Sequence, residues 1–148
     1  MNTIKKFTLT VCLVLLGSLL GLSGPANAAE SFKLIVNADN PVASMDTKDV
    51  AKLFIKRVST WDDGTSADPV DQAPDSAVRE AFSETVHGRS VTAVKSYWQK
   101  QIFSGRGVPP PELSSDAAVV DFVKKNRGAI GYVSAGADVS GVKVITLR

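Results

Sequence analysis

The sequence predicts an α/β fold, with short strands and amphipathic helices alternating along one domain. Three observations favour this class. Apolar runs typical of strands lie near both ends, at residues 32–36 and 142–147. Between them, apolar residues recur at helical spacing in several segments, and Gly- or Pro-containing turns separate these segments. No internal repeat or interdomain linker divides the chain.

Residues 1–28 have the pattern of a secretory signal peptide. Lys5 and Lys6 precede an apolar run over residues 9–22, and Ala26-Asn27-Ala28 is a small-x-small cleavage site. A membrane anchor is the alternative, which the shortness of the run disfavours. We therefore expect a periplasmic chain that begins at Ala29 and has no stable membrane insertion after cleavage.

The domain of residues 29–148 would hold 148 − 28 = 120 residues, enough for one hydrophobic core. The one cysteine, Cys12, lies in the predicted signal peptide, so the domain has no disulfide and no thiol nucleophile. The chain has 17 basic and 15 acidic residues, and two of the basic ones, Lys5 and Lys6, belong to the signal peptide. The remaining 15 of each sign make a neutral domain, which excludes a nucleic-acid-binding function.

The first half of the domain alternates strand and helix signals. Residues 32–36 (FKLIV) read as a strand that ends in a loop at 37–41, and residues 46–55 read as a helix capped by Asp46. Residues 59–68 contain turn residues, including Asp63-Gly64, and Pro69-Val70 fits a brief extended stretch.

The second half is mostly helical. It is expected to contain helices over 75–86, from Ser90 through Ile102, and over 115–126, an irregular loop over 104–111, and strands over 129–133 and 142–147. The aromatic residues are expected in the core and at its rim rather than in a stacking platform: Trp61, Tyr97, Trp98 and Tyr132.

The start of the 75–86 helix is the first candidate site. A helix N-terminus offers free N–H donors and partial positive charge, which suit phosphate, sulfate or carboxylate, and the Ser76 hydroxyl can add a donor. The alternative is that Asp75 is simply the N-cap. Arg79, one turn into the helix, can reach an anion there or pair with Asp75.

The loop SGRGVPPPE is the second candidate. Glycines on both sides of Arg106 allow the backbone to bend closely and to direct a guanidinium at an oxyanion. The alternative is an exposed loop with a solvated arginine.

Catalysis and metal binding have no support in the motifs. There is no G-x-S-x-G stretch, no nucleophile–base pair and no Gly-rich nucleotide loop. His87 is the only histidine and lacks carboxylates at ligand spacing, so we expect it at the surface near a helix C-terminus. The sequence predicts a non-enzyme without metal or cofactor.

Three blocks resemble a known family. DVAKLFIKRVSTWDDG (residues 49–64), VDQAPDSAVREAF (70–82) and GAIGYV (128–133) occur in this order in the phosphate-binding proteins of ABC importers, within the periplasmic solute-binding superfamily. The resemblance covers nearly the whole domain but only the central lobe of those two-lobed proteins. It implies a single lobe of a type II periplasmic-binding-protein-like fold, a short sheet flanked by helices.

The resemblance also implies an anion site, most of whose ligands are replaced. The family segment reads Arg-x-Asp-x-Ser-Gly-Thr, and this chain has Gln72 and Pro74 at the first two positions. Ser76 is retained, whereas Ala77 and Val78 replace the glycine and threonine. A Gly-rich family loop matches SGRG here. The implied anion site comprises Asp75, Ser76, Ala77, Arg79 and Arg106.

Two functions follow from the resemblance. The first is a solute-binding-like protein that binds phosphate or another oxyanion weakly in connection with an ABC transporter, with the second half of the cleft supplied by another chain or a second copy. The second is a non-catalytic interaction or sensing domain that has lost the anion site and contacts an envelope protein.

Overall fold

The computed structural model describes residues 31–148, and the predicted signal peptide lies outside this range. A five-stranded sheet runs in the order β2-β7-β1-β6-β3. Its strands are β1 (Phe32–Asn37), β2 (Ser44–Met45), β3 (Asp68–Pro69), β6 (Ala129–Ser134) and β7 (Val142–Leu147). The central strand β1 pairs antiparallel with β6 and β7, whereas the edge strands β2 and β3 pair parallel.

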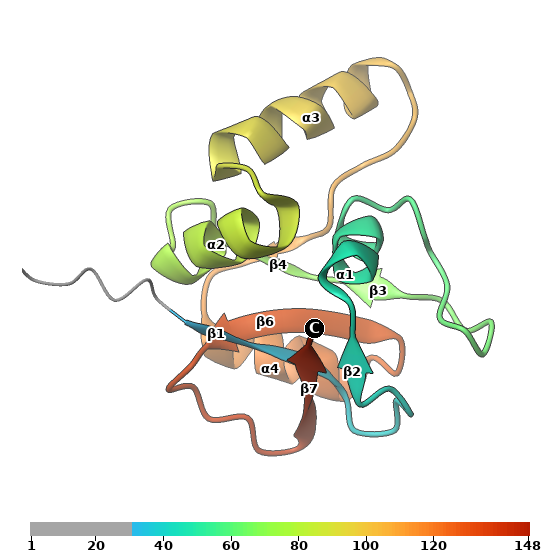
Figure 1. Ribbon diagram of the computed structural model, residues 1–148, viewed down its shortest axis with the longest axis vertical. Helices are drawn as coiled ribbons and strands as arrows, with labels where there is room; N and C mark the ends of the chain where they lie inside the picture. The colour runs from blue at the N-terminus through green and yellow to red at the C-terminus, as the bar shows by residue number, and fades with distance from the viewer. Residues whose placement is uncertain (1–30) are drawn as a thin grey trace, which may run out of the picture.

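Helices cover both faces of the sheet (Figure 1). On one face lie α1 (Thr47–Phe54), α2 (Ala77–Phe82) and the π-helical turn η1 (Ser83–His87), and on the other lies α4 (Asp116–Lys125). The alternation within β1 explains the division, because Leu34 and Val36 join the first core and Ile35 joins the second. The predicted α/β class is therefore confirmed.

The core facing α1 and α2 is aromatic. The Tyr132 and Phe82 rings stack with centroids 3.8 Å apart and planes 4° apart, and Phe54 tilts against Phe82 at 4.6 Å. Burial of Trp61, Trp98 and Tyr132 confirms their predicted core role, and Tyr97 is half-buried at the rim.

The α4 face is packed closely enough to require a glycine. A Cβ placed on Gly131 of β6 would lie 2.7 Å from Val119 Cγ1 and 2.9 Å from Val70 Cγ1. Gly131, the second glycine of GAIGYV, therefore allows α4 and Val70 to approach the sheet.

Helix α3 (Val91–Phe103) extends away from the sheet (Figure 1). Of its residues only Val94 and Trp98 are buried, and η1 is its main neighbour. The loop that follows carries left-handed backbone at Gly105 (φ 67°) and leads to β5 (Glu112–Leu113). Strand β5 pairs parallel with β4 (Asp71–Gln72) in a separate two-stranded ribbon.

The structure corrects several details of the sequence analysis. The helix expected over 75–86 is α2 followed by the π turn, and its N-cap is Ser76, so the expectation of an Asp75 cap is wrong. Asp46 occupies the N-cap position of α1, but its side chain makes no capping hydrogen bond. Strands β2 and β5 have two residues each, too few for a period-2 pattern to be recognised.

Candidate functional site

The start of α2 is shaped by its N-cap. The Ser76 Oγ accepts a hydrogen bond from the Arg79 backbone N–H at 3.1 Å. Asp75 is exposed beside it, and Ala77, the first helical residue, is exposed as well. The oxygen of this hydroxyl is thus the cap acceptor, and its O–H is the group that could still donate to an anion.

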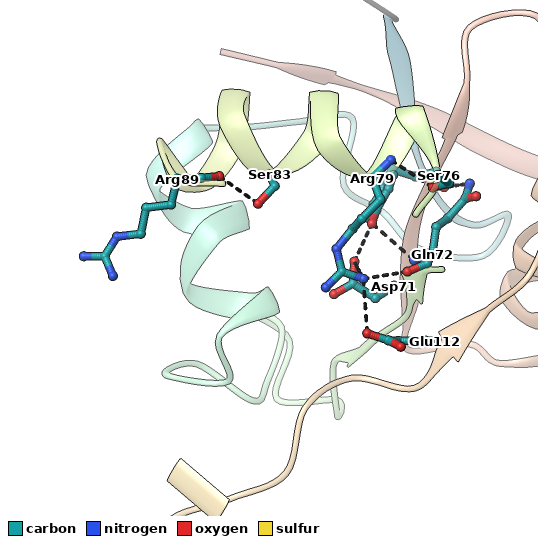
Figure 2. Close-up of polar contacts among 8 residues, drawn as sticks. Asp71, Gln72, Ser76, Arg79, Ser83, Arg89 and Glu112 are labelled. Carbon is teal, nitrogen blue, oxygen red and sulfur yellow. Dashed lines mark hydrogen bonds and ion pairs between the residues drawn. The ribbon is translucent and has the colours of Figure 1, made fainter. Parts of the chain in front are cut away.

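Arg79 turns inward from this helix start and is 3 % exposed. Its Nη1 lies 2.9 Å from Asp71 Oδ1 and 3.6 Å from Glu112 Oε1, and it donates to the Gln72 carbonyl oxygen at 2.6 Å (Figure 2). Of the two alternatives left open for Arg79, the pairing with Asp75 is not formed. Asp71 is the partner, because it lies on β4 directly beneath α2.

Tyr132 completes this arrangement from β6. Its hydroxyl donates to Asp71 Oδ1 and accepts from the Gln72 N–H at 3.2 Å. We call Asp71, Gln72, Arg79, Glu112 and Tyr132 the buried polar cluster, although the Glu112 side chain itself remains 43 % exposed.

The electrostatics of the cluster are dominated by desolvation. Burial raises the pKa of Asp71 to about 6, even though the Arg79 guanidinium and the Tyr132 hydroxyl favour its ionised form. Burial, followed by the nearby Asp71 carboxylate, raises the pKa of the Tyr132 hydroxyl. At neutral pH the cluster therefore contains an ionised Asp71 paired with Arg79, and the Tyr132 hydroxyl is neutral.

Gln72, which the resemblance places at the family's arginine position, also faces inward. Its Nε2 donates to Asp116 Oδ1 at 2.7 Å and to the Tyr132 carbonyl oxygen at 3.1 Å. Partial burial opposes ionisation of Asp116, but hydrogen bonds from Gln72 and Ser134 outweigh it and lower the pKa of that carboxyl. The Gln72 amide thereby connects α4 to β4 and β6.

Arg106 lies just beyond α3, between two glycines with positive φ, and it is exposed. Its backbone N–H donates to the Gln101 carbonyl oxygen at 2.9 Å. Figure 1 shows that the loop leaves α3 at the end farther from α2. The structure thus groups Asp75, Ser76, Ala77 and Arg79 at one helix start and places Arg106 on a separate loop.

Sequence reasoning missed three members of the buried polar cluster: Asp71, Glu112 and Tyr132. The sequence signal that could have pointed to Asp71 is its place directly after Val70, an apolar residue in a segment expected to be extended. His87 was also misplaced, because it is half-buried against the Phe82 ring at a centroid distance of 5.7 Å.

Residues 31–148 contain neither a cluster of metal-ligating side chains nor a helix suited to a membrane. No group of three or more His, Cys, Asp or Glu side chains is arranged to hold a metal ion there. In the same range, no helix combines the length and apolar character needed to cross a membrane.

Solved structures of phosphate receptors share this fold. An ABC-type phosphate transport receptor from Vibrio cholerae is 19 % identical, with a TM-score of 0.61 over 80 % of this chain and 46 % of its own. A putative phosphate ABC transporter substrate-binding protein with bound phosphate, from Clostridium perfringens, is 19 % identical, with a TM-score of 0.62 over 80 % and 45 %. A possible phosphate binding protein from Planctomyces limnophilus is 16 % identical, with a TM-score of 0.61 over 80 % and 42 %.

These similarities confirm the periplasmic-binding-protein fold and the resemblance to phosphate-binding proteins. The chain spans less than half the length of each of these three structures. No curated protein matches it. A family model described as a PBP superfamily domain matches residues 28–145. Because that match covers most of the chain, the protein belongs to the family of PBP superfamily domains.

Proposed function

We propose that this protein is a non-catalytic interaction or sensing domain of the periplasm, built on the solute-binding fold. The observation that carries the proposal is the buried polar cluster beside the helix start at which the resemblance implies an anion site. Arg79 is paired with Asp71, Gln72 is bonded to Asp116, and Ser76 caps α2. The Arg79 and Gln72 side chains, which would contact an anion, are bonded to other groups of the same chain, and Ser76 has only its O–H left to donate.

The charge balance around the start of α2 supports the same conclusion. Arg79 faces two carboxylates, Asp71 and Glu112, so no net positive charge remains at this position. Asp75 adds an exposed carboxylate beside the helix start. An incoming phosphate would be repelled rather than neutralised there.

A protein partner is favoured by the exposed surface at the end of α3. Ile102 and Phe103 at the end of α3 are 52 % and 94 % exposed, and Val108 in the loop that follows is 63 % exposed. Exposed apolar side chains this close together in the chain favour a binding surface. Residues 91–111 also carry Lys95, Lys100 and Arg106 and no acidic residue. The partner that fits this surface is an envelope protein with an apolar centre and an acidic rim.

A photo-crosslinker placed at Phe103 tests this surface. We expect a product in which this protein is crosslinked to an envelope protein. The product should be lost when Lys100→Glu and Arg106→Glu are introduced together, because the reversed charges repel an acidic rim. The matched position is Val144 on β7, which is 45 % exposed and should give no product. A product that survives charge reversal, or equal products at both positions, would argue against the proposed partner.

Weak binding of phosphate or another oxyanion, in connection with an ABC transporter, is the second candidate. The retained Ser76 at the helix start and the exposed Ala77 favour it. In this case the donors are the Ser76 hydroxyl and backbone N–H groups, including that of Ala77. Arg79 or Arg106 supplies positive charge. A second lobe or a second copy completes the cleft. An open single lobe predicts an affinity that falls with added salt.

Phosphate titration followed by amide NMR distinguishes the two candidates. The interaction-domain proposal expects no saturable shifts around Ala77 at about 10 mM phosphate, which would occupy a site of roughly millimolar Kd. Saturable shifts over residues 76–79 that disappear in Ser76→Ala would instead establish the oxyanion function.

The periplasmic location follows from the predicted signal peptide and has its own test. Mass spectrometry of the protein recovered from a periplasmic extract should give a chain that starts at Ala29. A product retaining residues 1–28 would contradict it.

A further inference from the structure

A cavity of about 190 Å³ lies between α1, η1 and α3, at the opposite end of the α2–η1 segment from Ser76. Its apolar wall is formed by Ala51, Ile55, Val94 and Tyr97. Its polar lining is formed by His87, Arg57 and Arg89. The cavity therefore combines an apolar wall with cationic side chains and no carboxylate.

The two arginines belong to different elements that the fold brings together. Arg57 follows α1, and Arg89 follows the left-handed turn at Gly88 (φ 60°) that ends η1. Ser83 Oγ donates to the Arg89 carbonyl oxygen at 2.9 Å and so holds this turn in place. Figure 2 shows the Arg89 side chain pointing away from the buried polar cluster. Within residues 31–148, no carboxylate lies within ion-pair distance of either arginine.

The pKa of His87 reflects the burial and the positive charge around the cavity. Burial, together with the positive charges of Arg79 and Arg89, lowers the pKa of its imidazole to about 4. It is thus neutral at pH 7, and the two arginines supply the positive charge of the lining. The other titratable group in the lining is the Tyr97 hydroxyl.

We propose that this cavity binds a small organic monocarboxylate with an apolar body. Arginine guanidiniums match carboxylate geometry and remain charged at every physiological pH. A cavity of roughly 150 Å³ accommodates benzene in another protein, so this volume suits a ring-sized or branched apolar group. Inorganic phosphate would leave the wall of Ile55, Val94 and Tyr97 without an apolar contact. The inference is independent of phosphate binding at α2.

Benzoate is the probe for this site, followed by amide and histidine side-chain NMR of the purified protein. We expect saturable shifts centred on His87 and Val94, and a rise in the pKa of His87 when benzoate is bound, because an added anion favours the imidazolium. Arg57→Gln and Arg89→Gln should each weaken binding by roughly tenfold or more, the effect of losing one charged hydrogen bond.

The matched control is Arg127→Gln, which removes an exposed arginine that does not line the cavity and should leave the affinity unchanged. Unchanged thermal midpoints in all three variants would show that the losses are not unfolding. Benzamide, the uncharged counterpart, should bind at least tenfold more weakly by the same argument. The proposal is overturned if benzoate gives no saturable shift, if benzamide binds equally, if phosphate binds there as tightly, or if Arg127→Gln weakens binding as much.

Discussion

The Asp71 carboxylate and the Arg79 guanidinium lie 2.9 Å apart, and their side chains are 6 % and 4 % exposed. The pair connects β4 to α2, and Tyr132 donates to the same Asp71 oxygen. A pair buried to this extent is costly to break from one side, because the remaining charge has no solvent to stabilise it.

Arg79→Met should therefore lower the free energy of unfolding by about 3–5 kcal/mol at pH 7, and Asp71→Asn by less, because Glu112 still faces the Arg79 guanidinium at 3.6 Å. The double variant should lose less than the sum of the two single losses, because neither charge is left alone. Urea denaturation measures all three. Lys125→Met is the control, since its pair with Asp121 is exposed at both ends and should change stability by less than about 1 kcal/mol. Additive losses would contradict a coupled pair.

Ser76→Ala should lower the stability by about 1 kcal/mol, because it removes the acceptor for the Arg79 N–H at the start of α2. Asp75→Ala should change it by no more than about 0.5 kcal/mol, as expected for an exposed residue outside the cap. Thermal and chemical unfolding of the two variants compare them directly. A larger loss in Asp75→Ala would restore Asp75 as the effective cap.

Gly131→Ala should destabilise the protein by roughly 1–3 kcal/mol, because the added methyl would overlap Val119 and Val70 on the α4 face. Gly136→Ala is the matched control, since a Cβ there meets nothing within 4 Å and its φ is not in the left-handed region. Gly131 is buried in β6 and Gly136 is exposed in a turn, and at neither position does a left-handed φ exclude alanine, so the comparison tests the space for the added methyl. Equal unfolding midpoints would show that α4 can move away from β6 at little cost.

The stability should depend on pH through two opposed groups. The pKa of His87 is about 4 in the folded chain against an ordinary value of about 6.5, so its contribution is present above 6.5 and lost as the pH falls through 4. The pKa of Asp71 is raised to about 6, so its contribution is present below about 3.9 and is lost as the pH rises through 6. Between these values the two changes oppose each other.

His87→Gln separates these contributions, because His87 is the only histidine in the sequence. Relative to the wild type, this variant should gain stability steadily as the pH falls from 7 to 4, in about the interval set by the ordinary and folded pKa values of histidine. Urea denaturation across this range gives the difference. Parallel pH profiles would mean that the pKa of His87 is not lowered by folding.

Local sequence patterns predicted most of the fold. The apolar runs of the first and last strands and the helical spacing in α1, α3 and α4 are properties of consecutive residues, so they are visible without the tertiary structure. The strands expected at 129–133 and 142–147 are confirmed, and Ser115 caps α4 as expected. The resemblance to phosphate-binding proteins was carried by the same local blocks.

The tertiary structure decided what the polar residues do. Arg79 pairs with Asp71 rather than with Asp75 because the pairing of β4 with β5 brings Asp71 and Glu112 together under α2. His87 is half-buried, rather than exposed at a helix end, because η1 packs it against Phe82. The first outcome depends on the pairing of β4 with β5 and the second on the packing of η1 against α1, and both bring together segments that are distant in the sequence. Burial and charge, which set a side chain's pKa and its freedom to bind a ligand, depend on those contacts and not on neighbouring residues alone.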